Sequence, residues 1–141
     1  MSKIYWDSMI FIYLLEEHPQ FAQKVERMQK QIESRGHRLV TSVFTVGEVL
    51  AGPRRLDAVR AVSAIKSYFQ SGRVELLPFD FETADRYSVL RSSFNLKQAD
   101  AIHLATAAVA GVDAFVTNDH DLLKLQIPGI SFMVGLDGRL F

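Results

Sequence analysis

The chain has 141 residues, of which 48% are hydrophobic and 23% are charged, a composition typical of a globular domain rather than of a disordered chain. At this length we expect one domain over residues 1–141. Its sixteen basic side chains balance sixteen acidic ones, and there is no cysteine, which excludes disulfides, thiolate metal sites and cysteine nucleophiles. No apolar run approaches the roughly 18 residues of a membrane span. Asp7 interrupts the apolar start, and charged residues follow it where a signal peptide needs a cleavage site, so we expect a cytoplasmic protein.

Hydrophobic periodicity predicts strands that alternate with helices along the chain. In chain order these are strand 3–6, helix 8–17, helix 20–34, strand 38–42, helix 44–50, helix 56–70, strand 74–78, helix 82–94, helix 98–110, strand 114–117, helical turn 122–125 and strand 130–134. Gly52 and Pro53 are expected to close helix 44–50, and helix 98–110 is apolar on nearly every side, as buried helices are. Because the alternation requires crossover connections, we predict a three-layer α/β/α sandwich around a mainly parallel sheet.

The charges are distributed unevenly along the chain. Residues 22–73 contain ten basic and four acidic side chains, whereas residues 74–141 contain five basic and nine acidic ones. A phosphate-binding face beside a carboxylate site has this pattern. The alternative is that the basic side chains cover the solvated outer faces of two long helices.

Four acidic residues follow predicted strands or begin predicted helices: Asp7, Glu48, Asp100 and Asp119. Ligands of parallel sheets bind beyond the carboxyl ends of the strands, so we expect these side chains to meet at one edge. Each also has a purely structural interpretation, as a helix cap, a partner of a helix dipole or a solvent-facing side chain. Glu48 and Asp100 stand in apolar runs, however, where a charge is costly unless it is paired or coordinated.

Four carboxylates at one edge require a counter-charge. Two of them about 4 Å apart repel by about 4 kcal/mol at an effective dielectric near 20. An all-oxygen set of this kind suits Mg²⁺ or Mn²⁺, and the four histidines show no zinc-ligand spacing. Since such an ion can activate water and neutralise a phosphate, the pattern indicates metal-assisted hydrolysis of a phosphodiester.

Polar neighbours of these acids have two interpretations that the sequence leaves open. Ser8, Thr117 and Asn118 can orient a carboxylate or a metal-bound water, or they can simply cap local turns. His103 lies one helical turn after Asp100, and we interpret it as a packed or surface histidine rather than a ligand. Asp121 is interpreted as a surface acid.

Three motifs carry a resemblance over essentially the whole chain: YWDSMIFIYLL, TSVFTVGEVLAG and QADAIHLATAAVAGVDAFVTNDHDL. They resemble the PIN-domain nucleases, in particular the VapC-type toxins of toxin–antitoxin pairs. The resemblance implies that Asp7, Glu48, Asp100 and Asp119 are the catalytic and metal-binding residues, and that Thr117 is the hydroxyl residue after the fourth strand.

The same resemblance implies an endoribonuclease that depends on Mg²⁺ or Mn²⁺, a homodimer, and inhibition by a cognate antitoxin whose tail enters the acidic site. Asn118 stands where many family members have a basic residue, which weakens the expectation of an RNA contact there. Arg54 and Arg55 are weaker candidates for contacts with RNA phosphates.

Other classes of phosphate-handling protein fit the sequence less well. A haloacid-dehalogenase-like phosphatase needs a second aspartate two residues after its nucleophile, but Met9 occupies that position after Asp7. A receiver domain needs an acidic pair near the first strand, and no GxxxxGK phosphate loop is present. Two alternatives remain open: an RNA-processing PIN nuclease outside a toxin–antitoxin pair, and a non-catalytic PIN scaffold that binds nucleic acid.

Overall fold

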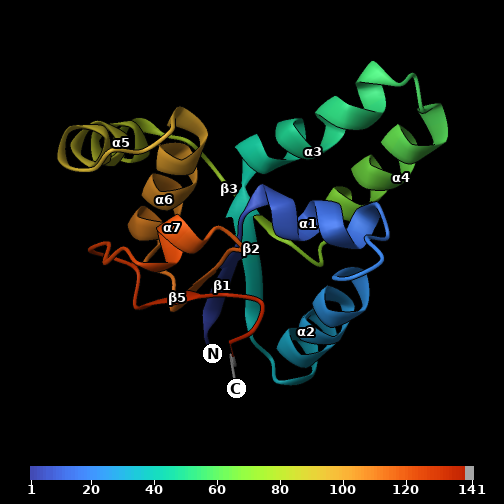
Figure 1. The fold of residues 1–141 in the computed structure, drawn as a ribbon, viewed down its shortest axis with the longest axis horizontal. Coiled ribbons are helices and arrows are strands. Elements are labelled where there is room, and N and C mark those ends of the chain that lie inside the picture. The colour runs from blue at the N-terminus through green and yellow to red at the C-terminus, as the bar shows by residue number, and fades with distance from the viewer. Residues whose placement is uncertain (139–141) are drawn as a thin grey trace.

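A parallel sheet runs through the middle of the molecule, and helices cover both of its faces (Figure 1). This computed structural model describes residues 1–138. Within them the sheet has five strands in the order β3-β2-β1-β4-β5, and every neighbouring pair is parallel. The strands are β1 (Lys3–Trp6), β2 (Arg38–Ser42), β3 (Glu75–Leu77), β4 (Ala114–Val116) and β5 (Phe132–Val134).

The helices form the two outer layers. Helices α1 to α4 lie on one face, and α5 to α7 lie on the other (Figure 1). Their bounds are α1 Ser8–Leu15, α2 Ala22–Ser34, α3 Val43–Arg55, α4 Val59–Gln70, α5 Phe81–Ser93, α6 Gln98–Ala110 and α7 His120–Leu123. The predicted three-layer α/β/α sandwich is confirmed, with a sheet that is parallel throughout residues 1–138.

Alternation along the central strand divides the core into two parts. Trp6 packs with Phe11 of α1 in the cluster beneath α1 to α4. Tyr5 faces the opposite side, where it stacks on Phe115 and joins Leu104 of α6. All five of these strand and helix residues are fully buried, so both faces of β1 are held in place by packing.

The boundary between β1 and β4 is the topological switch point of the sheet. The chain leaves β1 into α1 on one face, whereas it leaves β4 towards α7 on the other. Because the two connections diverge, a crevice forms beyond the carboxyl ends of these strands, which is where ligands bind in open parallel sheets. The fold therefore points to the residues that directly follow Trp6 and Val116.

The predicted end of helix 44–50 is wrong. Helix α3 continues through Gly52 and Pro53 to Arg55. A helix usually stops before proline because the proline ring collides with the Cβ and N–H of the preceding residue, but Gly52 has no Cβ. Pro53 also lies in the last turn, so the missing N–H costs one hydrogen bond of the helix. Asp57, whose φ is +52°, then makes the turn before α4, which begins three residues later than predicted.

Strands 3–6 and 38–42 and helix 98–110 have the bounds that the sequence predicts. Apart from the end of α3, which lies five residues beyond its predicted position, the bounds of the remaining elements differ from their predicted positions by at most three residues. None of the helices within residues 1–138 has the length and apolar character needed to cross a membrane.

Candidate functional site

A hollow of about 270 Å³ lies beyond the carboxyl ends of β1 and β4. Three of the four predicted acidic residues line it. Its lining residues are Asp7, Met9, Tyr13, Asp100, Asn118 and Asp119. The hollow thus occupies the switch point and is bordered by carboxylates from three different parts of the chain.

Asp7 directly follows β1 and caps α1. Its Oδ1 accepts a hydrogen bond from the backbone N–H of Ile10 at 3.4 Å, and its Oδ2 accepts one from the hydroxyl of Thr117. Burial raises the pKa of Asp7 to about 6, although the hydrogen bond from Thr117 opposes the shift. The predicted cap and the predicted site residue are therefore the same side chain, which is less readily ionised than an ordinary aspartate.

Asp100 and Asp119 complete the acidic lining. Asp100 lies in the first turn of α6, and its pKa is raised by burial and then by the negative charge of Asp119. Asp119 caps α7, where it accepts from the backbone N–H groups of Asp121 at 2.9 Å and Leu122 at 3.4 Å. A carboxyl group whose pKa is raised by a neighbouring negative charge favours binding of a cation.

Glu48 lies beside the hollow rather than in its lining. Its side chain projects from α3, is 30% exposed, and pairs with Nε2 of His103 at 2.6 Å. The hydroxyl of Ser8 also donates to the same oxygen, Oε1. Burial acts to raise the pKa of Glu48, but the hydrogen bonds from His103 and Ser8 outweigh it and lower the pKa. The charge of Glu48 in turn raises the pKa of Asp100, so the fourth acid belongs to the same electrostatic group.

The four acids do not form a closed cage. Within residues 1–138, no three acidic or histidine side chains converge closely enough to hold a metal ion by themselves. Mg²⁺ usually keeps several waters and binds through one or two carboxylates together with substrate phosphates. An open, all-oxygen set whose members repel one another fits such a hydrated hard cation, and it does not fit a fully protein-ligated zinc.

The structure shows what each polar neighbour contacts, and Thr117 combines both interpretations, because its hydroxyl also accepts the backbone N–H of Asp119. Ser8 and Thr117 each donate to a carboxylate, the first to Glu48 and the second to Asp7. Asn118 instead donates to the hydroxyl of Tyr13 at 3.0 Å, at the side of the hollow. Two of the three therefore orient an acid, and the third orients a tyrosine.

The other residues considered in the sequence lie outside the hollow. His103 is a packed side chain, 4% exposed, as interpreted, and it contacts Glu48 rather than Asp100. Asp121 is exposed. Arg54 and Arg55 are exposed in the last turn of α3, six and seven residues beyond Glu48, which corresponds to about 9–10 Å along the helix.

Sequence reasoning missed two tyrosines at this site. Tyr13 lines the hollow from α1, and Tyr5 hydrogen-bonds to Nδ1 of His103 at 2.7 Å. The periodicity of their surroundings indicates only core positions. The one available signal is chemical, since a buried tyrosine hydroxyl needs a partner.

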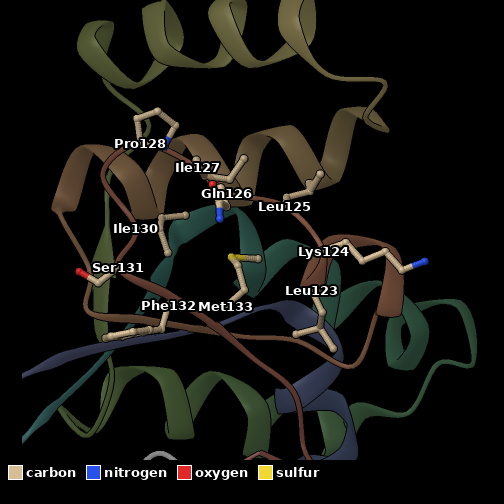
Figure 2. A pocket seen from close by; sticks show the side chains of 10 residues that line it. All are labelled: Leu123, Lys124, Leu125, Gln126, Ile127, Pro128, Ile130, Ser131, Phe132 and Met133. Carbon is tan, nitrogen blue, oxygen red and sulfur yellow. The ribbon is translucent and has the colours of Figure 1, made fainter.

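A second, larger hollow of about 610 Å³ lies at the β5 edge of the sheet. Figure 2 shows the ten side chains that line it, all from the segment 123–133. Lys124 is the one charged residue among them, and the lining contains neither a carboxylate nor a histidine. The chemistry of the acidic hollow is therefore absent here.

Residues 4–127 match the PIN domain family, which confirms the family indicated by the three sequence motifs. None of the curated proteins compared with the chain is recognisably similar in sequence.

Solved structures resemble the chain over most of its length. VapBC2 from Rickettsia felis, bound to a DNA fragment from its promoter, has a TM-score of 0.77 at 15% identity, covering 94% of this chain and 98% of that one. VapC20 from Mycobacterium tuberculosis, described as a sarcin-ricin loop cleaving toxin, has a TM-score of 0.68 at 16% identity, covering 84% and 91%. A toxin–antitoxin complex from Klebsiella pneumoniae has a TM-score of 0.64 at 19% identity, covering 93% and 99%. At these identities the likeness establishes the fold.

Proposed function

Because the chain belongs to the PIN domain family, we propose that it is a metal-dependent endoribonuclease and the toxin of a toxin–antitoxin pair. The observation that carries the proposal is the acidic hollow at the switch point. Asp7, Asp100 and Asp119 line one space there, and the pKa values of Asp7 and Asp100 are raised. Residues 1–141 act as a single nuclease domain in this account.

The residues of the hollow would hold Mg²⁺ or Mn²⁺. Asp7, Asp100 and Asp119 supply carboxylate oxygens, and Glu48 adds a fourth carboxylate from α3. When bound, the ion supplies charge neutralisation at the phosphodiester and activation of the attacking water. The protein itself fixes the carboxylates: Thr117 holds Asp7 through Oδ2, and the first turn of α6 holds Asp100.

RNA is favoured as the substrate for two reasons. The basic stretch 22–73 gives the chain a phosphate-attracting region beside the acidic one, and one structural neighbour is described as a sarcin-ricin loop cleaving toxin. Arg54 and Arg55, exposed at the end of α3, are candidates to contact the RNA backbone away from the scissile phosphate.

The partners follow from the same neighbours. The neighbour from Klebsiella pneumoniae is described as a toxin–antitoxin complex, and a further one, VapBC-5 from Mycobacterium tuberculosis, as a member of a family of toxin–antitoxin systems. These descriptions support a cognate antitoxin for this chain. In the proposed form the protein is a cytoplasmic homodimer, and the tail of the antitoxin occupies the acidic hollow.

Cleavage of mixed structured RNAs by the purified protein tests the activity. Reactions contain Mg²⁺, Mn²⁺ or a chelator, with the wild type beside Asp7→Asn, which keeps the cap of α1 because asparagine also accepts hydrogen bonds there. We expect cutting by the wild type with either metal and none in chelator or in the variant. If neither metal supports cutting in a preparation without a copurifying inhibitor, the non-catalytic scaffold becomes the better account.

The toxin role has a separate test. Induced expression of the wild type, without its neighbouring genes, should arrest growth of a bacterial host, and Asp7→Asn should not. If the wild type and Asp7→Asn arrest growth equally, or if the wild type cuts RNA without arresting growth, an RNA-processing role is favoured.

A further inference from the structure

The carboxylate of Glu48 is held from two sides by residues next to the other acids. Ser8, which follows Asp7, donates its hydroxyl hydrogen to Oε1 of Glu48. His103, one turn after Asp100 on α6, approaches the same Oε1 with Nε2 at 2.6 Å. Within residues 1–138 the other oxygen, Oε2, accepts no hydrogen bond, so it is the oxygen left for a ligand.

The ring of His103 is in turn fixed from behind. Its Nδ1 lies 2.7 Å from the hydroxyl of Tyr5, and that hydroxyl accepts a hydrogen bond from the backbone N–H of Ser42 at 3.2 Å. Tyr5 is fully buried and stacks on Phe115 with ring centroids 5.0 Å apart. The ring of Phe44 packs edge-on against His103 at 5.7 Å. The imidazole is therefore held by neighbours from β1 and α3, and Ser42 at the end of β2 in turn holds the hydroxyl of Tyr5.

The direction of the hydrogen bonds follows from this arrangement. The N–H of Ser42 can only donate, so the hydroxyl of Tyr5 is free to donate to Nδ1 of a neutral His103, which leaves the hydrogen on Nε2. A cationic His103 carries hydrogens on both nitrogens. In both cases Nε2–H points to Glu48, and the contact is the same whichever form is present.

We infer that Tyr5 and His103 form a positioning pair that holds Oε1 of Glu48 through the imidazole N–H and thereby leaves Oε2 available to a metal ion beside the hollow. The inference rests on the proposed function and adds two residues to its machinery. Neither touches the substrate, and their role is to orient a carboxylate. Hydrogen-bond partners of metal-ligating groups typically change metal affinity or activity by about 10–100-fold when they are removed.

The test measures Mn²⁺ affinity by electron paramagnetic resonance without RNA. We expect His103→Ala to weaken binding about 10–100-fold and His103→Gln to restore part of the loss, because its amide N–H reaches towards the same oxygen. Tyr5→Phe, which keeps the ring that packs on Phe115, should fall between wild type and His103→Ala. The matched control is Thr106→Val, a buried polar residue one turn further along α6 that donates to the carbonyl of Ile102; its affinity should stay within about twofold of wild type.

A measurement without metal tests the contact between His103 and Glu48 independently of nuclease activity. In chelator, the Nε2–H proton of His103 should give a slowly exchanging, downfield NMR signal that moves in Glu48→Gln. If the wild type binds Mn²⁺ and His103→Ala binds it with the same affinity, the positioning role is overturned. The same holds if His103→Gln binds Mn²⁺ no more tightly than His103→Ala does. Neither result affects the proposed nuclease. A missing NMR signal overturns the positioning role as well. A wild type that binds no Mn²⁺ and cuts no RNA overturns the proposed function itself.

Discussion

The hydroxyl of Thr117 donates a hydrogen bond to Oδ2 of Asp7, and so joins the residue after β4 to the residue after β1. The same hydroxyl oxygen accepts the backbone N–H of Asp119 at 3.1 Å. Thr117 is fully buried, so its position is fixed by the core. One threonine thus sets the spacing of two acids on opposite sides of the switch point.

Thr117→Val should therefore impair the nuclease more than the fold. Valine has nearly the same shape but cannot donate, and the hydrogen bond from Thr117 lowers the pKa of Asp7. Without it the pKa of Asp7 rises above about 6, and the acid limb of the pH–rate profile moves to higher pH. We expect a 10–100-fold loss of activity at pH 7, measured by RNA cleavage between pH 5 and 9. Thr117→Ser should keep the wild-type profile, and an unshifted profile in the valine variant would contradict this role.

The raised pKa of Asp7 also predicts how stability changes with pH in the metal-free protein. The folded state binds the proton of Asp7 more tightly than the unfolded state does, so the stability that this proton contributes is present below about pH 4 and is lost as the pH rises through about 6. The shift corresponds to at most about 3 kcal/mol. In chelator, Asp7→Asn should melt several degrees above the wild type at pH 7.5.

The comparison at low pH is the control for that prediction. Near pH 4, where Asp7 is largely protonated in the folded wild type, the two melting temperatures should converge. A variant that melts below the wild type at pH 7.5 would mean that the negative charge of Asp7 stabilises the metal-free fold.

Asp100→Asn tests the mutual repulsion of the carboxylates. Burial and the charge of Asp119 raise the pKa of Asp100, so removing its charge should raise the melting temperature in chelator at pH 7.5. Bound metal stabilises by mass action, and that gain should be large in the wild type and small in the variant. Asp85→Asn, an exposed acid on α5, should change neither value. A lowered melting temperature for Asp100→Asn in chelator would assign this residue a structural role.

Much of the fold follows from local sequence pattern. The short strands Lys3–Trp6 and Arg38–Ser42 are apolar runs with clear ends, and helix Gln98–Ala110 ends at Gly111, whose φ of +66° suits glycine. The end of α3 could not be predicted in the same way. Gly52 and Pro53 usually stop a helix, and their tolerance here depends on the missing Cβ of Gly52 and on the burial of Pro53 in this fold.

The candidate site likewise has one part that the sequence predicts and one part that it does not. Asp7 directly follows β1 and Asp119 lies three residues beyond β4, so topology alone predicts that they meet. The link between Glu48 and His103 joins residues 55 positions apart and requires α1, α3 and α6 to pack together. No local pattern encodes that packing, and the sequence therefore indicated a packed histidine without its partner.

The salt dependence of RNA binding tests Arg54 and Arg55. Each phosphate that a basic side chain neutralises in single-stranded RNA adds about 0.7 to the slope of log affinity against log salt. If both arginines contact phosphates, the double variant Arg54→Gln with Arg55→Gln should lower the magnitude of the slope by about 1.4 units. The matched control is Arg91→Gln with Lys124→Gln, which removes the same charge from exposed positions on the other face. Equal slopes in the two double variants would remove Arg54 and Arg55 from the RNA-binding surface.

The acidic hollow is proposed to carry a metal-dependent cleavage of RNA. The most direct test compares Asp119→Asn with Asp121→Asn, because the two acids are two residues apart but only Asp119 lines the hollow. RNA cleavage is measured in Mg²⁺ and in chelator for both variants and the wild type. In Mg²⁺ we expect full activity for the wild type and Asp121→Asn and at least a 100-fold loss for Asp119→Asn. In chelator we expect no cleavage by any of the three proteins. Equal activity of the two variants, or cleavage that persists in chelator, would contradict the proposal.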